Sequence, residues 1–181
     1  MSEDLDVRRQ RTLLDLARSA IRRHLGAEKT KKTIAADPIL DEPRGAFVTL
    51  EVDGQLRGCI GYPLPYKPLA QTIQEVAVSA ASQDYRFEPL RGEELDRLKI
   101  EISVLSLPKP VQSPEEVEVG RHGIIISKGN YRGLLLPQVP VEYGWDRETF
   151  LSHGCLKAGL RPDEWKKGAE IEIFTAQVFS E

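Results

Sequence analysis

The stretch GAFVTLEVDGQLRGCIG, residues 45–61, decides the fold prediction because it places two apolar runs on either side of a two-residue turn. Asp53-Gly54 between such runs is a strong signal for a β-hairpin, since both residues tolerate the positive φ angles that the turn requires. We therefore predict one strand over residues 45–51 and a second strand from Leu56 to Ile60.

One of the two cysteines of the chain lies in the second strand, within Leu56-Arg57-Gly58-Cys59-Ile60-Gly61. Glycine in a strand costs packing and backbone entropy, so two glycines beside a thiol indicate a bulge, a tight bend or a surface that another group approaches closely. Residues i and i+2 share a strand face, so Arg57 is expected beside Cys59, where a guanidinium favours the reactive thiolate. The alternative is a small cysteine that packs in a buried strand.

Apolar residues with a period near 3.6 predict two long helices. The first runs from Val7 to Leu25 and ends at Gly26, and the second covers residues 69–82 after a proline-rich loop. Pro108 and Pro110 then mark a candidate boundary, beyond which short strands predict a β-rich region. The remaining predictions are helices at residues 93–98 and 146–159, and strands at residues 99–107, 123–127, 133–136 and 169–179.

Composition limits the classes of protein to consider. With 181 residues and 40% hydrophobic content, the chain can form one sizeable core or two small ones. A net charge of −3 and a pI near 5.7 argue against general nucleic-acid binding. No apolar run approaches the roughly 20 residues that span a bilayer, so we expect a cytoplasmic protein without a membrane segment. A nucleic-acid role rests only on basic residues near the amino terminus, which are Arg8, Arg9, Arg22, Arg23 and Lys29–Lys32.

Cysteine and histidine spacing predicts neither a disulfide framework nor a metal site. Cys59 and Cys155 are far apart in the sequence, and the three histidines are scattered, so no local spacing matches a zinc site. His153 is two residues from Cys155 and does not share its helix face, which argues against a local cysteine–histidine pair. Pairing of Cys59 with His122 or His153 across the fold is a further hypothesis.

A second candidate region is the stretch Asp84-Tyr85-Arg86-Phe87-Glu88-Pro89. It follows a predicted helix and ends at a proline, so we expect a loop, and loops held by a scaffold often carry function. The structural alternative is a local ion pair between Asp84 and Arg86, with Phe87 anchoring the turn. The sequence leaves both interpretations open.

Several of these segments together resemble the AMMECR1 domain family. The similarity includes LRGCIG at residues 56–61 and ASQDYRFEPL at residues 81–90, and it continues through EISVL (101–105), GLLLPQV (133–139) and CLKAGL (155–160) with Trp165. It therefore covers nearly the whole chain. The resemblance implies an α+β fold, mainly an antiparallel sheet flanked by helices, with a smaller β-rich second domain and a cleft between them.

On this basis, residues 1–112 plus 169–181 are expected to form the larger α+β domain, and residues 113–168 the smaller one. The resemblance assigns no reaction. Asp84, Arg86 and Phe87 match motif positions of the family, whereas Tyr85 stands where proline is common. Prokaryotic relatives are often grouped with a Memo-like protein and a radical SAM protein, which implies these two as candidate partners.

Two hypotheses for the function follow. In the first, the cleft binds a small molecule or a modified partner, and Cys59 with Arg57 provides thiol chemistry in a pathway shared with the radical SAM protein. In the second, the same region is a non-catalytic module for protein interaction or ligand binding. No phosphate-binding loop or dinucleotide fingerprint occurs, so the sequence identifies no cofactor. The candidate binding residues are Gly58, Gly61, Asp84, Arg86, Phe87 and His153.

Overall fold

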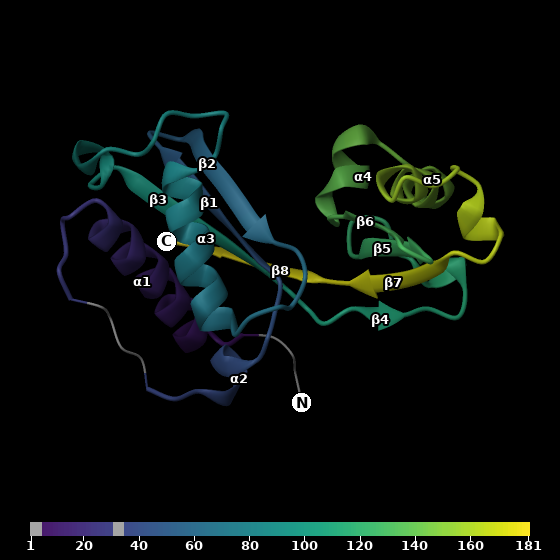
Figure 1. Cartoon of the computed structure of the whole chain (residues 1–181), viewed down its shortest axis with the longest axis horizontal. Helices are drawn as coiled ribbons and strands as arrows, with labels where there is room; N and C mark the ends of the chain where they lie inside the picture. Colours follow the sequence, from purple (N-terminus) through teal and green to yellow (C-terminus); the bar gives the residue numbers. More distant parts are fainter. Residues whose placement is uncertain (1–4, 31–34) are drawn as a thin grey trace. The chain divides into compact units, whose positions relative to one another are not determined.

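The computed structural model describes residues 5–30 and 35–181 and divides the chain into two compact units. Unit 1 consists of the residues up to 105 together with residues 177–181, and unit 2 consists of residues 106–176. Each unit is built on its own four-stranded sheet with its own helices, as Figure 1 shows. The predicted α+β class with mainly antiparallel sheets is confirmed.

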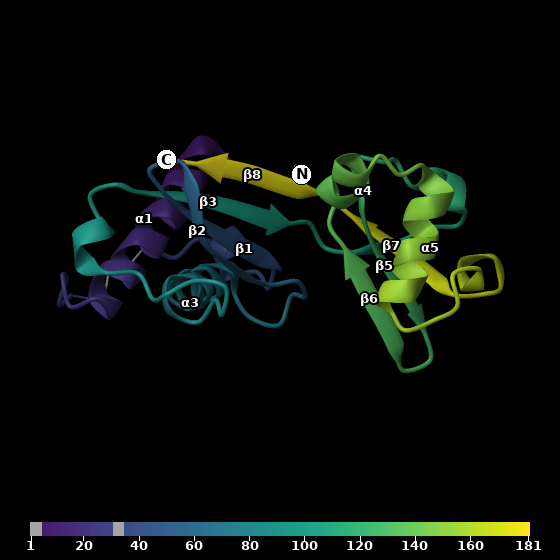
Figure 2. The same ribbon diagram turned by 90° about the horizontal axis from the view of Figure 1, so that it is seen from above.

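The sheet of unit 1 has the strand order β2-β1-β3-β8. β1 (Ala46–Val52) and β2 (Gln55–Tyr62) form the predicted hairpin, and β1 also pairs with β3 (Leu98–Leu105). The turn residues Asp53 and Gly54 have φ angles of 53° and 76°, as a two-residue hairpin turn requires. β8 (Ala176–Ser180) lies beside β3 and pairs with it (Figure 2), so β2 and β8 form the two edges of the sheet.

Two long helices pack on one face of this sheet. α1 (Val7–His24) begins after Asp6, whose carboxylate accepts the Arg9 N–H, and α3 (Leu69–Ser82) follows the proline-rich loop. A short helix, α2 (Pro38–Asp41), precedes β1. Both long helices were predicted from their apolar period. The core that they form with alternate residues of β1 and β3 includes Leu16, Ile21, Val48, Ile73, Ile100 and Ile102.

The sheet of unit 2 has the strand order β4-β7-β5-β6. Helix α5 (Arg147–Lys157) begins at the predicted cap Asp146, whose carboxylate accepts the Thr149 N–H at 2.8 Å. Helix α4 (Gln138–Tyr143) precedes it. The core of this unit includes Ile124, Ile126, Phe150, Leu151 and Cys155. The four antiparallel strands are β4 (Lys109–Pro110), β5 (Gly123–Lys128), β6 (Tyr131–Leu135) and β7 (Glu170–Phe174).

Two predicted elements differ from the structure. The helix expected at residues 93–98 is a single 3-10 turn, Gly92–Glu94; two further 3-10 turns are Pro114–Glu116 and Glu164–Lys166. The strand expected at residues 169–179 is interrupted at Thr175, so β7 joins the sheet of unit 2 and β8 the sheet of unit 1. The alternating pattern did not reveal this break, because both halves have the same period.

The boundaries of the units lie at 105/106 and 176/177, outside the expected 112/113 and 168/169. The pairing of β4 with β7 brings both flanking segments into unit 2. Ser106 and Thr175 join these segments, because each backbone N–H donates to an oxygen of the other residue at 2.9 Å. Pro110 therefore lies in the edge strand β4, within unit 2. Among the described residues, no helix is both long and apolar enough to cross a bilayer.

Candidate functional site

The glycines on either side of Cys59 are explained by close packing on both faces of β2. A Cβ atom on Gly58 would lie 2.1 Å from the carbonyl oxygen of Ala80 in α3, so only glycine fits there. A Cβ atom on Gly61 would lie 2.3 Å from the ring of Phe47 on the neighbouring strand. Because Gly58 faces α3, the half-buried Cys59 side chain lies on the opposite face of the sheet.

A bulge sets the neighbours of the Cys59 side chain. The register between β1 and β2 shifts between Leu50 and Glu51, so that Thr49 lies opposite Cys59. The Thr49 hydroxyl donates to the Cys59 Sγ atom at 3.3 Å. Glu101 of β3 pairs with Thr49 on its other side. Cys59, Thr49 and Glu101 therefore form a row across three strands on the face away from α3.

Asp84 and Arg86 bind the outer edge of β2 at Cys59. The Asp84 carboxylate accepts the Cys59 backbone N–H at 2.9 Å, and Arg86 donates to the Cys59 carbonyl at 3.4 Å. Arg86 also donates to the two Asp84 carboxylate oxygens, at 2.9 and 2.7 Å. The two side chains thus take the place of a neighbouring strand on an edge that would otherwise expose backbone groups. We call this pair the edge clamp.

The edge clamp is buried at its centre and exposed at its rim. Asp84 is only 5% exposed, and hydrogen bonds from Arg86 hold the pKa of its carboxyl group well below the ordinary value, although burial acts in the opposite direction. The Arg86 guanidinium lies over the Phe87 ring at 5.3 Å. Tyr85 is 96% exposed. The loop therefore combines the predicted ion pair with a direct contact to the Cys59 backbone.

The Arg57 guanidinium binds residues 88–94. Its guanidinium donates to the Glu94 carboxylate at 2.8 and 3.1 Å, to the Pro89 carbonyl at 3.1 Å and to the Glu88 carbonyl. This ion pair lowers the pKa of Glu94. Arg57 is itself the extra, unpaired residue of the bulge, so the alternation on which its expected position beside Cys59 depended is interrupted there. Its contacts support a role in anchoring residues 88–94.

The other candidate residues belong to unit 2. His153 stacks on Trp145, with ring centroids 3.8 Å apart and an interplanar angle of 11°. His122 is buried, and its Nδ1 atom accepts the Glu118 backbone N–H at 3.1 Å. Cys155 is fully buried, and this burial raises the pKa of its thiol. Pairing of either histidine with Cys59 stays a hypothesis, because Cys59 belongs to unit 1.

Among residues 5–30 and 35–181, no group of three or more histidine, cysteine or acidic side chains is arranged to hold a metal ion.

Two residues of the site were not identified from the sequence. Phe47 covers Gly61, and Thr49 contacts the thiol. If the pairs of a regular hairpin are counted outward from the Asp53-Gly54 turn, Thr49 is expected opposite Gly58. In the structure Thr49 lies opposite Cys59, because the bulge adds one residue on β2.

Comparison with known proteins places this site in a family context. The family model named AMMECR1 matches residues 14–179. The chain belongs to the AMMECR1 family. Protein MK0488 of Methanopyrus kandleri is 49% identical over 191 residues, covering 100% of this chain and 92% of that protein. Protein MJ0810 of Methanocaldococcus jannaschii is 47% identical over 175 residues, covering 91% of this chain and 86% of that protein.

A solved structure supports the AMMECR1 fold. The crystal structure of the uncharacterized protein PH0010 from Pyrococcus horikoshii matches with a TM-score of 0.73 and 44% sequence identity, covering 94% of this chain and 90% of that chain. The family and the fold are therefore shown, while the function of this AMMECR1 chain rests on the chemistry of its own residues.

We expect the two thiols to differ strongly in reactivity. In the native protein, a thiol reagent such as DTNB should modify Cys59, whereas Cys155 should react roughly a hundredfold more slowly, because it needs local unfolding and its thiol pKa is raised by burial. Spectrophotometric titration of the wild type and of a Cys155→Ala variant assigns each phase. Two thiols that react at equal rates before unfolding would contradict the buried position of Cys155.

Proposed function

We propose that the surface of unit 1 around Cys59 and the edge clamp binds a partner protein, and that the thiol contacts this partner without acting as an activated nucleophile. The observation that carries the proposal is that the charged side chains near Cys59 are bound to other groups of unit 1. Arg57 is held by Glu94, and Asp84 and Arg86 bind each other and the Cys59 backbone. The hydrogen bonds of these groups go to carboxylates and backbone atoms and not to the sulfur, although the charge of Arg86 also interacts with Cys59.

The residues that stay accessible suit an interface. Tyr85 is almost fully exposed, and the Arg86 side chain is 46% exposed above the half-buried Phe87. Tyrosine and arginine are enriched among the residues that contribute most to protein–protein binding. Because the edge clamp fixes the backbone on which these side chains stand, little conformational entropy is lost when a partner binds.

The family resemblance suggests a Memo-like protein and a radical SAM protein as the partners to test first. The cytoplasmic location and the cleft between two domains also stay predictions.

The basic residues near the amino terminus support a nucleic-acid role less well than the surface around Cys59 supports protein binding. Arg9 forms ion pairs with Asp6 and Asp37, and Arg22 forms one with Glu28 at 3.6 Å. Lys31 and Lys32 lie outside the described residues.

The test measures the affinity of the full chain for the purified Memo-like and radical SAM proteins of the same organism. Tyr85→Ala should weaken binding by about tenfold or more, because truncation of an exposed interface anchor is costly. Cys59→Ser should retain affinity within about threefold, since the change leaves the shape of the surface intact. Tyr66→Ala is the matched control, because Tyr66 is 75% exposed elsewhere in unit 1.

One outcome would decide against the choice of partners, and another would decide against the proposed surface. If neither protein binds the wild-type chain, the choice of partners is wrong. If one of them binds and a Tyr85→Ala, Phe87→Ala double variant keeps wild-type affinity, the surface around the edge clamp is not the interface.

Thiol chemistry is the second candidate function, and the hydroxyl of Thr49 directed at the Cys59 Sγ atom favours it. Its test is the rate of alkylation of Cys59 as a function of pH in a Cys155→Ala background, with and without Thr49→Val. A rate at least tenfold above that of a cysteine peptide, reduced by Thr49→Val, would favour chemistry over binding. A slow rate that Thr49→Val leaves unchanged would favour the binding surface.

A further inference from the structure

Three aromatic rings of unit 2 stack on one another at the junction between α4 and α5. The rings of Tyr143 and Trp145 have centroids 5.0 Å apart and an interplanar angle of 19°, and Trp145 also stacks on His153. The φ angle of 65° at Gly144 ends α4, and the Trp145 N–H then donates to the Pro140 carbonyl at 2.8 Å. Tyr143 and Trp145 thereby lie on either side of a tight turn. We call the three rings the aromatic stack.

The aromatic stack is anchored in unit 2 and has one open ring face. Trp145 packs against the core of the unit, and His153 belongs to α5. Tyr143 is 68% exposed, and its contact with Trp145 covers only one face of the tyrosine ring. The other face of Tyr143 is therefore available to a planar group that continues the stack.

Other rings of the chain show which group such a face accepts. Among the described residues, a cationic side chain lies over the ring in three pairs, which are Lys67 over Tyr62, Arg86 over Phe87 and Lys166 over Trp165. Each of these cations also forms an ion pair with a carboxylate, at 2.6, 2.7 and 3.2 Å respectively. A ring face together with a carboxylate is thus the arrangement that binds cations in this protein.

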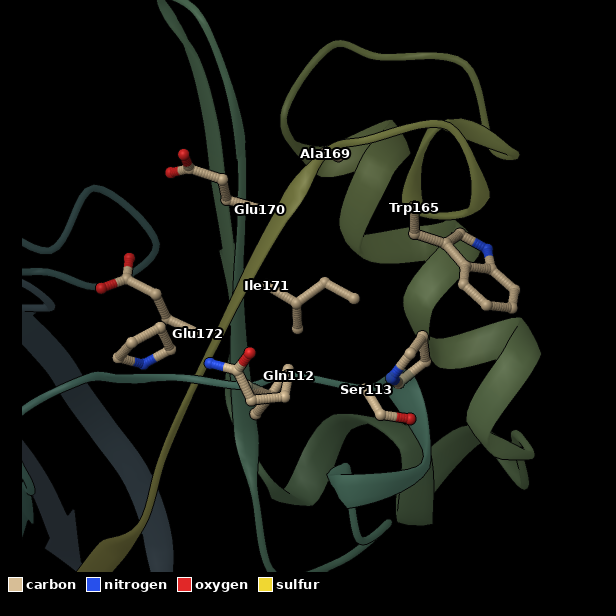
Figure 3. Close-up of a pocket in the computed structure, with 10 residues that line it drawn as sticks. Gln112, Ser113, Trp165, Ala169, Glu170, Ile171 and Glu172 are labelled. Carbon is tan, nitrogen blue, oxygen red and sulfur yellow. The ribbon is translucent and has the colours of Figure 1, made fainter.

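Trp165 shows this arrangement completed by the chain itself. Its indole lines a pocket of about 400 Å³ beside β7 (Figure 3), and its N–H donates to the Ser152 hydroxyl at 3.2 Å. The Lys166 ammonium lies 4.6 Å from the centre of the indole and pairs with Glu148. A cation from another molecule would have to compete with Lys166 for this ring.

The aromatic stack has the ring and the carboxylate but no such cation. In the part of the chain that the structure describes, no lysine or arginine lies over the Tyr143 ring. The preceding residue, Glu142, is exposed and forms no ion pair among the described residues. Asp146 is a second exposed acid at this turn. The nearest cation in the sequence, Arg147, donates its Nε–H to the Val117 carbonyl.

From this arrangement we propose that the open face of Tyr143 binds the guanidinium of an arginine from a partner protein, with Glu142 as its counter-ion. A guanidinium is planar, so it can continue a stack of parallel rings, which a tetrahedral ammonium cannot do. The carboxylates of Glu142 and Asp146 disfavour an anionic ligand. An exposed ring encloses little of a small molecule, so a larger partner has to hold the arginine in place.

The site belongs to unit 2, so the inference is independent of the function proposed for the surface around Cys59 in unit 1. Its test is an NMR titration of the isotope-labelled full chain with the peptide acetyl-Gly-Arg-Gly-amide. One control peptide has citrulline, which is planar but uncharged, and the other has lysine, which is charged but not planar. At equal ionic strength, both controls should bind at least about threefold more weakly than the arginine peptide.

The signals that move locate the site. The arginine peptide should shift the backbone amides of residues 142–145 and the Trp145 indole N–H, and it should leave the Trp165 indole N–H unchanged.

Two pairs of variants assign the binding to named side chains. Tyr143→Leu should weaken binding of the arginine peptide about three- to fivefold, whereas Tyr131→Leu, which removes another exposed ring of unit 2, should not change it. Glu142→Gln should weaken it about twofold at low salt, whereas Glu170→Gln, a change at another exposed acid of unit 2, should have no effect.

Each of four results would overturn the inference. The first is no shift of residues 142–145 at tens of millimolar arginine peptide. The second is equal binding of the lysine or the citrulline peptide, which would show that the stack does not select a planar cation. The third is wild-type affinity in Tyr143→Leu. The fourth is tighter binding of free arginine than of the peptide, which would assign the site to the amino acid and not to a partner protein.

Discussion

Replacing Asp84 with alanine should lower the free energy of unfolding of unit 1 by about 2–3 kcal/mol at pH 7. The substitution removes the acceptor of the Cys59 backbone N–H and the partner of Arg86, and it leaves both donors unsatisfied next to a buried position. Urea unfolding should be followed by circular dichroism, because α1 and α3 belong to unit 1 and both tryptophans belong to unit 2.

The effect of Asp84 should depend on pH in a defined direction. Its native pKa lies below the unfolded value of about 3.9, so the carboxylate stabilises the native state above that pH. As the pH falls below about 4, the unfolded state takes up a proton first and this contribution is lost progressively. The difference in stability between the wild type and Asp84→Asn should therefore be constant from pH 5 to 7 and smaller at pH 3.

Glu101→Gln is a suitable control for Asp84→Asn, because Glu101 is an exposed acid on β3 in the same sheet. Its stability difference should stay within about 0.5 kcal/mol over the same pH range. An Asp84→Asn variant with wild-type stability at pH 7 would contradict the edge clamp.

The hairpin could be predicted from the sequence because its turn chemistry is local. Asp53-Gly54 determines the turn without reference to any other part of the chain. The contacts of Arg57 could not be predicted in the same way, because Arg57 is an extra residue in β2 that has no partner on β1. The bulge is stabilised by contacts with residues 88–94, which are distant in the sequence.

The meeting of Cys59 with Asp84 also depends on tertiary structure. Asp84 reaches the edge of β2 because α3 packs over Gly58 and ends at Ser82, two residues before Asp84. The sequence showed two unusual motifs, at residues 56–61 and 84–89, and both match the family. The hydrogen bond between the Cys59 N–H and the Asp84 carboxylate forms only because α3 packs on β2. The break at Thr175 also depends on tertiary structure, because β7 and β8 pair with strands of different sheets and the local sequence pattern does not show this.

Gly58→Ala should be among the most destabilising single substitutions in unit 1, with an expected loss of at least about 3 kcal/mol. The added Cβ atom would lie 2.1 Å from the Ala80 carbonyl oxygen and 3.0 Å from its carbonyl carbon. Both are backbone atoms of α3, so the clash cannot be relieved by rotating a side chain. The helix or the strand has to move, and either movement disturbs the buried core.

Two other glycine substitutions separate this clash from general effects of losing glycine. Gly92→Ala meets nothing within 4 Å, so its effect should stay within about 0.5 kcal/mol. Gly54→Ala also has open space but requires a φ angle of +76°, which should cost about 1–2 kcal/mol. Urea unfolding of unit 1 should therefore rank the losses as Gly58→Ala, then Gly54→Ala, then Gly92→Ala.

The same variant links the packing of β2 to the candidate site. If β2 moves away from α3, the bond from the Cys59 N–H to Asp84 lengthens and the edge clamp loosens. Alkylation of Cys59 in a Cys155→Ala background should then be faster with Gly58→Ala than with Gly92→Ala. Equal stability and equal alkylation rates in these two variants would mean that the close approach of α3 to β2 does not hold Cys59 in place.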